Sequence, residues 1–221
     1  MSQPGAVVFD FDGVLADTER LHLLAFQEAF RERGWTLTDS AYFDRYLGFD
    51  DRDLVRAFTI DARVALTPGD EDAIVAGKAR AYEAHVSRGS VLFPGAASAL
   101  ARLGARYRLG IASGSLRAEI EHVLGRHTLA PAFRAIVGAD DVSRSKPAPD
   151  VYLTALDRLD VPAARAVAIE DSRWGLAAAR AAGLHTIAVT TSYPAATLSS
   201  ADRVVTSLDE IGVELIEQLI N

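Results

Sequence analysis

A chain of 221 residues, of which 49% are hydrophobic and 24% charged, is long enough to bury a full core, either as one domain or as a domain with a large insertion. Its formal net charge of −7 argues against a general nucleic-acid-binding surface, because phosphate backbones are bound chiefly by clustered lysines and arginines. The chain contains no cysteine, which excludes disulfides, thiolate catalysis and thiolate metal sites.

The chain lacks the hydrophobic stretches that mark membrane proteins and secreted precursors. No stretch reaches the roughly 18 apolar residues that a membrane-spanning helix needs, and the first residues lack the pattern of a secretory signal. We therefore expect a cytoplasmic protein without a membrane partner, and the net charge predicts that a nucleic acid is not its partner either. The sequence leaves open whether the protein is a monomer or a small homo-oligomer.

The first predicted element is a strand, Ala6-Val7-Val8-Phe9, that ends in the acidic turn Asp10-Phe11-Asp12-Gly13. An apolar run without alternation suits a strand covered on both faces, as in a parallel sheet. Gly13 lets the backbone turn sharply, so that Asp10 and Asp12 stand at the carboxyl end of the strand. In extended geometry their Cα atoms are roughly 6 to 7 Å apart, and two like charges so close are costly unless a cation or a shared proton joins them. A turn rich in Asp and Gly without a chemical role would also explain these residues.

After Asp17 the pattern takes a helical period that continues to about residue 87 and includes no predicted strand. We predict a first helix that has its N-cap at Thr18, runs to residue 32 and stops at Gly34, followed by helices at 37–46, 50–58 and 70–86. This block, residues 18–87, is interpreted as an inserted all-helical cap domain. Its expected partner is a core domain of residues 1–17 and 88–221, and the expected hinges lie at 16–17 and 86–92.

Strands and helices alternate along the rest of the chain. The predicted strands are 107–112, 135–137, 166–169, 184–189 and 203–205, and the predicted helices are 96–103, 116–124, 150–159, 173–182 and 208–220. Such alternation implies βαβ units with right-handed crossovers. We therefore predict an α/β fold with a doubly wound, Rossmann-like parallel sheet.

Three of the predicted strands end in polar residues that can do chemistry. The first is followed by Asp10 and Asp12, the second by Ser113, and a later one by Glu170 and Asp171. Because parallel strands share one carboxyl edge, these groups can converge although they are far apart in sequence. Carboxylate oxygens, a backbone carbonyl and water are ligands that Mg²⁺ prefers, and Mg²⁺ in turn favours phosphate oxygens.

A positive side chain would let these carboxylates approach a phosphate dianion. Lys146 is the candidate, because the prolines of Ser145-Lys146-Pro147-Ala148-Pro149-Asp150 stiffen its segment. Ser113 and the amides of Gly114 and Ser115 open a predicted helix, where anions bind readily. Structural roles would explain the same residues: a solvated loop lysine, a serine N-cap, and helix capping by the acidic pair.

Four motifs, in this order, resemble those of the haloacid dehalogenase superfamily, and the resemblance spans essentially the whole chain. They are Asp10-Phe11-Asp12-Gly13-Val14-Leu15-Ala16-Asp17-Thr18-Glu19, Ala112-Ser113-Gly114-Ser115, Ser145-Lys146-Pro147-Ala148-Pro149-Asp150 and Ile169-Glu170-Asp171-Ser172. The helical block that follows the first motif is similar to that of the beta-phosphoglucomutase-like phosphatase branch.

The resemblance implies a mechanism. Asp10 would attack phosphorus and form an aspartyl phosphate, and Asp12 would act as general acid and then as general base. Ser113 and Lys146 would hold the phosphoryl oxygens. Mg²⁺ would sit between Asp10, the Asp12 carbonyl and Asp171, supported by Glu170.

We expect a Mg²⁺-dependent phosphatase of small phosphorylated metabolites, in particular sugar phosphates. Dehalogenation is rejected, because cleavage of a carbon–halogen bond would need neither an acid at Asp12 nor the acidic pair at 170–171. The alternative is a beta-phosphoglucomutase, which must hold a second phosphate in the cap. There Asp51 follows Gly48-Phe49-Asp50 where the family has an arginine, and Arg52 is displaced by one position. A non-catalytic phosphosugar-binding regulator is a further alternative, although it would need neither a nucleophile nor an acid.

Further substrate-binding residues are suggested by the resemblance. His22 and Lys78 match a histidine and a lysine of the family's cap, whereas Leu116-Arg117 replace the family's Lys-Asn. The candidate substrate-binding residues are thus Ser113, Gly114, Ser115, Lys146, His22, Lys78, Arg52 and Arg117. The stretch 189–193, Val-Thr-Thr-Ser-Tyr, ahead of Ala201-Asp202-Arg203-Val204, is similar to that of phosphatases related to pentose bisphosphate metabolism. The hinges would let the cap open for substrate and close to limit water.

Overall fold

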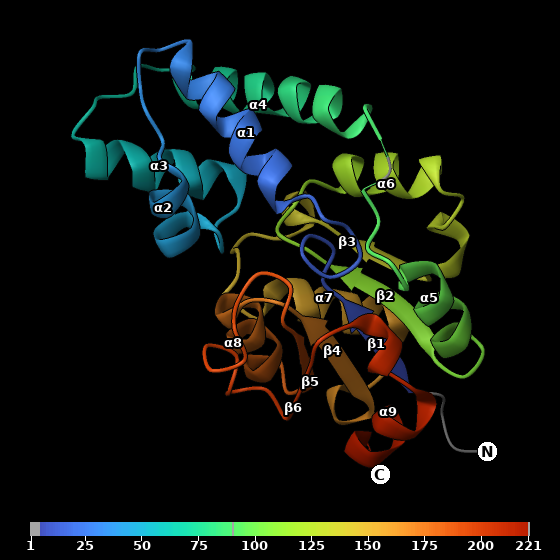
Figure 1. The fold of residues 1–221 in the computed structure, drawn as a ribbon. Helices are drawn as coiled ribbons and strands as arrows, with labels where there is room; N and C mark the ends of the chain where they lie inside the picture. Colours follow the sequence, from blue (N-terminus) through green and yellow to red (C-terminus); the bar gives the residue numbers. More distant parts are fainter. Residues whose placement is uncertain (1–4, 90, 221) are drawn as a thin grey trace. The chain divides into compact units, whose positions relative to one another are not determined.

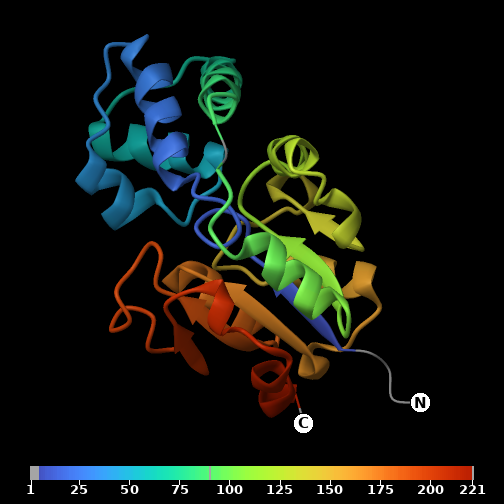
Figure 2. The ribbon, with the colours of Figure 1, turned by 45° about the vertical axis from the view of Figure 1, so that its right-hand side comes forward.

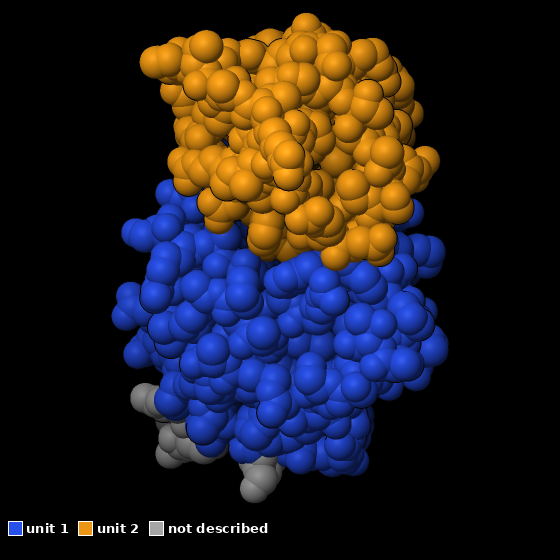
Figure 3. Space-filling view, turned by 90° about the vertical axis from the view of Figure 1, so that its left-hand side faces the viewer, with its two compact units in different colours: residues 1–17, 92–221 blue, residues 18–91 orange. Residues whose placement is uncertain are grey.

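The structure, a computed structural model, describes residues 5–89 and 91–220. The ends of the predicted core range, 1–4 and 221, and residue 90 of the predicted second hinge lie outside the described residues. The chain forms two compact units, which Figure 3 distinguishes by colour: the first unit comprises residues 1–17 and 92–221, and the second unit residues 18–91. No helix in the described part combines the length and the apolar character needed to cross a bilayer.

The first unit is built on a parallel sheet whose described strands follow the order β3-β2-β1-β4-β5-β6 (Figure 1). The strands are β1 Ala6–Phe9, β2 Arg108–Ala112, β3 Ala135–Val137, β4 Ala166–Glu170, β5 His185–Val189 and β6 Arg203–Val205. Phe9 of β1 pairs with Ile111 of β2 on one side and with Ile169 of β4 on the other. The strand before the acidic turn is therefore flanked by the two strands that precede Ser113 and Asp171, and the predicted α/β fold with a Rossmann-like parallel sheet is confirmed.

Helices cover both faces of this sheet, as two neighbouring residues of β2 show. Consecutive side chains of a strand point to opposite faces. A Cβ atom added to Gly104, in α5 (Ala96–Gly104), would meet the Leu109 side chain, whereas one added to Gly110 would meet Leu159, in α7 (Asp150–Leu159). Thus α5 and α7 lie on opposite faces. Helix α8 (Arg173–Ala181) packs beside α7, and α9 (Val213–Ile220) lies on the side of α5 (Figure 2).

The core beneath α7 and α8 combines small side chains from the strands with larger ones from the helices. Its members include Ala6, Val8, Ala112, Ala166 and Ala168 from the strands, and Tyr152, Leu156 and Leu159 from α7. Small strand residues let the helices approach the sheet closely, which brings the buried Tyr152 near the carboxyl end of β4. Helix α6 spans Arg117–Arg126, and short 3₁₀ turns occur at Ala130–Ala132, Ala139–Asp141 and Ala163–Arg165.

The second unit has its own core, made by α1 (Glu19–Arg31), α3 (Asp51–Ala62) and α4 (Asp70–Val86) with the short α2 (Asp39–Ala41) and a π-helical turn at Tyr42–Tyr46. Each long helix turns its apolar residues inward, among them Leu23, Phe26, Phe30, Leu54, Phe58 and Ile74. The Phe30 and Phe58 ring centroids are 4.4 Å apart. Hydrophobic burial at this scale accounts for the unit's compactness.

Two predicted helix boundaries in the second unit differ from the structure by two residues or more, and one predicted N-cap lacks its hydrogen bond. The predicted helix 37–46 begins later, because the Thr38 Oγ1 accepts a hydrogen bond from the Ala41 amide at 3.2 Å and so caps α2 at residue 39. Helix α3 extends to Ala62, four residues beyond the predicted end at 58. Thr18 holds the N-cap position of α1, as predicted, but its side chain makes no cap hydrogen bond.

The predicted helix 208–220 is broken into a 3₁₀ turn, Leu208–Glu210, and α9. The Arg102 guanidinium donates hydrogen bonds to the carbonyl oxygens of Leu208 and Ile211, both at 3.0 Å. A continuous helix would need these carbonyls for its own hydrogen bonds. The tertiary contact of Arg102 therefore ends the turn, and Gly212 precedes the start of α9.

Candidate active site

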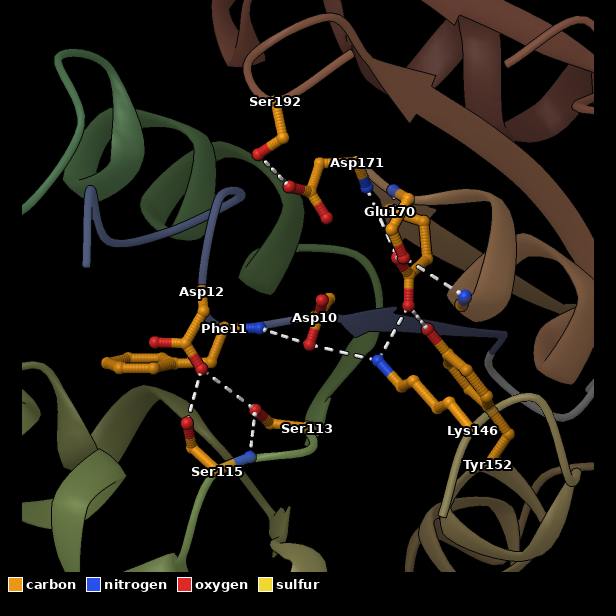
Figure 4. A network of polar contacts seen from close by, with 12 residues as sticks. Asp10, Phe11, Asp12, Ser113, Ser115, Lys146, Tyr152, Glu170, Asp171 and Ser192 are labelled. Atoms are coloured by element: carbon orange, nitrogen blue, oxygen red, sulfur yellow. Dashed lines mark hydrogen bonds and ion pairs between the residues drawn. The ribbon is translucent and has the colours of Figure 1, made fainter. Parts of the chain in front are cut away.

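The carboxyl ends of β1, β2 and β4 meet in the first unit, as the sheet order requires (Figure 4). The Asp10 amide donates a hydrogen bond to the Ile169 carbonyl at 2.8 Å, which extends the ladder between β1 and β4 by one residue. On the other side, the Ser113 amide donates to the Val137 carbonyl of β3 at 3.0 Å. The side chains that follow these strands therefore face one another across a short distance.

Asp10 is held through one of its two carboxylate oxygens. Its Oδ1 accepts a hydrogen bond from the Phe11 amide at 2.8 Å and lies 3.0 Å from the Lys146 Nζ. Figure 4 shows the second oxygen pointing toward the side of Asp171. Burial and the negative charge of Glu170 raise the pKa of Asp10 well above its ordinary value, and Lys146 offsets part of this rise.

Lys146 is buried between two carboxylates. Its Nζ lies 2.6 Å from the Glu170 Oε1 and 5.2 Å from the centre of the Tyr152 ring. Burial by itself would lower the pKa of Lys146, but the charges of Asp10 and Glu170 outweigh burial and raise it above its ordinary value. The ammonium therefore stays charged at physiological pH, and the structural alternative of a solvated loop lysine is wrong.

Glu170 is fully buried, and hydrogen-bond donors surround both of its carboxylate oxygens. Oε1 accepts from the Tyr152 hydroxyl at 2.7 Å as well as from Lys146, and Oε2 accepts from the Asp171 amide and the Ser172 hydroxyl, each at 3.2 Å. Burial and the charge of Glu170 raise the pKa of Tyr152 well above its ordinary value, so its hydroxyl remains a donor. This arrangement suits a residue that positions Lys146.

The Asp12 carboxylate faces the serines that follow β2. Its Oδ2 accepts hydrogen bonds from the Ser115 hydroxyl at 2.6 Å and the Ser113 hydroxyl at 3.3 Å (Figure 4). Helix α6 has Leu116 as its N-cap residue, so the alternative that Ser113 merely caps this helix is wrong. A Cβ atom added to Gly114 would meet nothing within 4 Å, which leaves open space beside the amide of Ser115.

Asp10, Glu170 and Asp171 form an acidic group that could hold a metal ion. One carboxylate oxygen from each residue lies within 4.8 Å of the others, and all three side chains are buried. Burial and the charge of Glu170 raise the pKa of Asp171 to about 7. These carboxylates outnumber the single ammonium of Lys146 in the network, so a divalent cation would relieve their repulsion. Hydrogen-bond donors already occupy both carboxylate oxygens of Glu170. Asp10 and Asp171 are therefore better placed to bind the ion directly.

Four other predicted site residues lie away from this group of carboxylates or in the second unit. Arg117, on α6, pairs with Glu121 at 2.8 Å, and its side chain is 44% exposed. In the second unit, Arg52 pairs with Glu71 and Asp72, each at 2.6 Å.

The other two predicted site residues, His22 and Lys78, lie beside Tyr82 in the second unit. The His22 ring stacks on the Tyr82 ring with centroids 4.2 Å apart, and the Lys78 Nζ lies 5.0 Å from the centre of the same ring. Lys78 is buried, and its Nζ lies 2.8 Å from the Asp51 Oδ2. The carboxylate that stands where the family has an arginine thus pairs with the predicted cap lysine.

Three residues of the network were not predicted as functional: Tyr152, Ser172 and Ser192. Tyr152 lies on the apolar face of α7, where helical periodicity indicates only a core residue. Ser172 follows the acidic pair and was expected at most to cap α8, which it does by accepting a hydrogen bond from the Gly175 amide at 3.0 Å. Ser192 lies in the stretch 189–193, which only the resemblance to phosphatases related to pentose bisphosphate metabolism connects with function.

Comparisons with known proteins agree with this geometry. A family model described as haloacid dehalogenase-like hydrolase matches residues 7–189, a range that includes every residue of the acidic group. Protein CbbY of Rhodobacter capsulatus is 36% identical to this chain, over 97% of this chain and 98% of that protein. The beta-phosphoglucomutase of Bacillus subtilis is 30% identical, over 96% of this chain and 94% of that enzyme.

This chain is also similar in three dimensions to a solved structure of a CbbY protein. The crystal structure of a mutant CbbY from Rhodobacter sphaeroides in complex with xylulose-(1,5)-bisphosphate matches with a TM-score of 0.85 at 32% identity, over 96% of this chain and 98% of that one. The sheet order, the converging strand ends and these near full-length matches agree with one another. The chain therefore belongs to the haloacid dehalogenase-like hydrolase family, in its beta-phosphoglucomutase-like phosphatase branch.

Proposed function

We propose that this protein is a Mg²⁺-dependent phosphatase of small phosphorylated sugars that acts through an aspartyl phosphate on Asp10. The observation that carries the proposal is the convergence of Asp10, Lys146 and Asp171 in one buried group. A carboxylate can approach a phosphate dianion only where positive charge offsets the repulsion, and the Lys146 ammonium lies 3.0 Å from Asp10.

The proposed reaction has two steps, both centred on phosphorus. In the first, an Asp10 carboxylate oxygen forms a bond to phosphorus while the bond from phosphorus to the sugar oxygen breaks, and Asp12 donates a proton to that leaving oxygen. In the second, Asp12 takes a proton from a water molecule that attacks phosphorus, and the bond to Asp10 breaks. Inorganic phosphate leaves, and both carboxyl groups return to their starting protonation states.

The neighbours of these two residues have supporting roles in the proposal. Lys146 and the Ser113 hydroxyl would hold the phosphoryl oxygens, together with the amides of Gly114 and Ser115. The Ser115 hydroxyl, 2.6 Å from the Asp12 Oδ2, would orient the general acid. A Mg²⁺ ion held by Asp10, the Asp12 carbonyl and Asp171, with Glu170 in support, would supply charge stabilisation for the phosphoryl group.

The substrate class is proposed from two observations. A CbbY relative that is 32% identical was crystallised with xylulose-(1,5)-bisphosphate, which supports a phosphorylated sugar. In the second unit, Asp51 pairs with Lys78, so that a carboxylate stands where a mutase would need positive charge for a second phosphate. We further propose that the second unit acts as a cap whose His22, Lys78 and Arg52 select the substrate, and that Arg117 of the first unit contributes to substrate binding.

A phosphate-release assay tests this function. The protein is incubated with Mg²⁺ and a panel of sugar phosphates that includes xylulose 1,5-bisphosphate and beta-glucose 1-phosphate, and released phosphate is measured. We expect steady phosphate release from at least one sugar phosphate, and its loss by a factor of 10⁴ or more, on the order expected for removing a nucleophile, in Asp10→Asn. Chelation of Mg²⁺ should abolish the release as well.

The matched control is Asp157→Asn, the same chemical change at an exposed position of α7. It should leave the rate unchanged. Conversion of beta-glucose 1-phosphate to glucose 6-phosphate without net phosphate release would instead identify a mutase. Binding of sugar phosphates with no turnover at all would identify a non-catalytic binder, and either result would overturn the proposed function.

A further inference from the structure

The loop that follows β5 reaches the acidic group through two consecutive side chains. The Ser192 hydroxyl donates a hydrogen bond to the Asp171 Oδ2 (Figure 4). The Thr191 hydroxyl donates to the Gly13 carbonyl. The first contact ties the loop to the turn after β4, and the second ties it to the turn after β1. Three strand ends are thus linked at the point where Asp171 faces Asp10.

The loop is anchored independently of these two contacts. The Thr190 amide donates to the Val205 carbonyl of β6 at 3.0 Å. Leu198, further along the loop, is buried against Leu176 of α8 and Ala188 of β5, and Tyr193 packs against the same cluster. Ser192 therefore projects from a segment that is held by backbone pairing on one side and by apolar packing on the other.

The contact of Ser192 fixes which oxygen Asp171 presents. A carboxylate has two oxygens, and the hydroxyl of Ser192 takes Oδ2. Figure 4 shows the other oxygen of Asp171 directed toward Asp10. A Cβ atom added to Gly13 would lie 1.9 Å from the Asp171 Oδ2 and 2.9 Å from the Ser192 Oγ, so the hydrogen-bonded pair packs directly against this glycine. Gly13, with a φ of +76°, supplies both the turn and the room.

We propose that Ser192 is a positioning residue for the metal-binding carboxylate of Asp171. Its hydroxyl engages one carboxylate oxygen and so presents the other to a divalent cation shared with Asp10. Without this hydrogen bond the carboxylate can rotate about its terminal torsion, which has no steep intrinsic preference. The ion would then have to order its ligand on binding, and groups that hold ligands in this way typically contribute about 10- to 100-fold to metal affinity. This inference rests on the metal site of the proposed function.

Direct metal binding tests the inference without reference to turnover. Mn²⁺ binding is titrated by electron paramagnetic resonance of the free ion in wild-type protein and in Ser192→Ala, and Mg²⁺ binding is measured by competition. We expect Ser192→Ala to bind Mn²⁺ about 10-fold more weakly than wild type. An isosteric pair isolates the hydroxyl group: Ser192→Thr should keep an affinity near that of wild type, whereas Ser192→Val should lose it as the alanine variant does.

The matched control is Ser199→Ala, because Ser199 is an exposed serine of the same loop. It should bind Mn²⁺ as wild type does. Equal affinities for Ser192→Thr and Ser192→Val, or an unchanged affinity in Ser192→Ala, would overturn the inference, as would a wild-type protein that binds no Mn²⁺. Expected shifts in a protein that binds Mn²⁺ but releases no phosphate would support the role of Ser192 and contradict only the proposed function.

Discussion

At the scale of single residues, a close approach of the Gly175 backbone to the Glu170 carboxylate is needed for the hydrogen-bond network around Lys146. A Cβ atom added to Gly175, in the first turn of α8, would lie 1.8 Å from the Glu170 Oε1. The same oxygen accepts hydrogen bonds from Lys146 and Tyr152. The missing side chain of Gly175 therefore gives Glu170 the room from which it holds the lysine.

Gly175→Ala is expected to be destabilising, although alanine is the better helix former. Helix propensity alone predicts a gain of roughly 0.5 to 1 kcal/mol for this exchange. The structure predicts instead a loss of about 1 to 3 kcal/mol from overpacking, and a fall in kcat of about 100-fold because Lys146 is displaced. Chemical denaturation and the phosphate-release assay measure the two effects.

Gly125→Ala is the control for this prediction, because a Cβ atom added at Gly125, in α6, would meet nothing within 4 Å. It should stabilise the protein by up to about 1 kcal/mol and leave kcat unchanged. Equal changes in stability and in kcat for the two alanine variants would show that the close approach of Gly175 to Glu170 affects neither quantity.

At the scale of elements, the most accurate predictions were those in which local signals and tertiary packing agree. The bounds of α4, α7, β3 and β6 are those predicted from the sequence. Helix α4 has a glycine at its N-cap position and acidic residues through its first turn, and both features favour the start of a helix. The helix predicted at 208–220 also begins with acidic residues, but the contact of Arg102 with two of its carbonyls overrode the periodic pattern.

The first residue of α4 gives a pH prediction. The Asp70 Oδ2 accepts hydrogen bonds from the hydroxyl and the amide of Thr67, and its Oδ1 pairs with Arg33. These contacts, the Thr67 hydroxyl first, lower the pKa of Asp70 to about 2. An unfolded aspartate titrates near pH 4 (about 3.9), so the folded state binds fewer protons than the unfolded state between about pH 4 and pH 2. The stability contributed by Asp70 is therefore complete above about pH 4 and is lost as the pH falls through this window.

Asp70→Asn tests this contribution. The variant should be less stable than wild type at pH 7, and the difference should shrink as the pH falls from 5 to 3, because the wild-type carboxylate becomes protonated in the unfolded chain first. Urea denaturation at several pH values measures the difference. A gap of constant size across this range would show that Asp70 contributes through its shape and not through its charge.

At the scale of the whole molecule, the chain divides into two units with separate cores. The second unit packs its helices around Phe30, Phe58 and their neighbours, and the first unit packs its sheet between two helical layers. The polypeptide passes from one unit to the other at two places, between residues 17 and 18 and between residues 91 and 92. Two compact units joined by two short segments have the connectivity of hinged domains.

We expect the second unit to change its orientation relative to the first when a phosphate analogue and Mg²⁺ bind. Because the natural chain has no cysteine, two introduced cysteines can be spin-labelled without background. Thr36→Cys combined with Asp157→Cys places one label on each unit, and the distance between the labels is measured by double electron–electron resonance. The distance distribution should shift on ligand binding.

Two labels within the second unit, Thr36→Cys and Glu83→Cys, provide the reference for this measurement, since their separation should not respond to ligand. A distribution between the units that is the same with and without the analogue would contradict the proposed cap motion and leave the chemistry of the first unit unaffected.

The sequence by itself determined the alternation of strands and helices and placed Asp10, Ser113 and Asp171 just after strands of one parallel sheet, because apolar periodicity is local and parallel strands end at a common edge. Lys146 follows no strand, so only the tertiary structure places its ammonium beside Asp10. Only the tertiary structure decided which hydroxyl groups face which carboxylates. Ser113 and Ser115 contact Asp12, and Tyr152 and Ser192 complete the surroundings of Glu170 and Asp171. These contacts join elements that are distant along the chain. Their geometry depends on how loops and helices pack, which no local pattern of residues encodes.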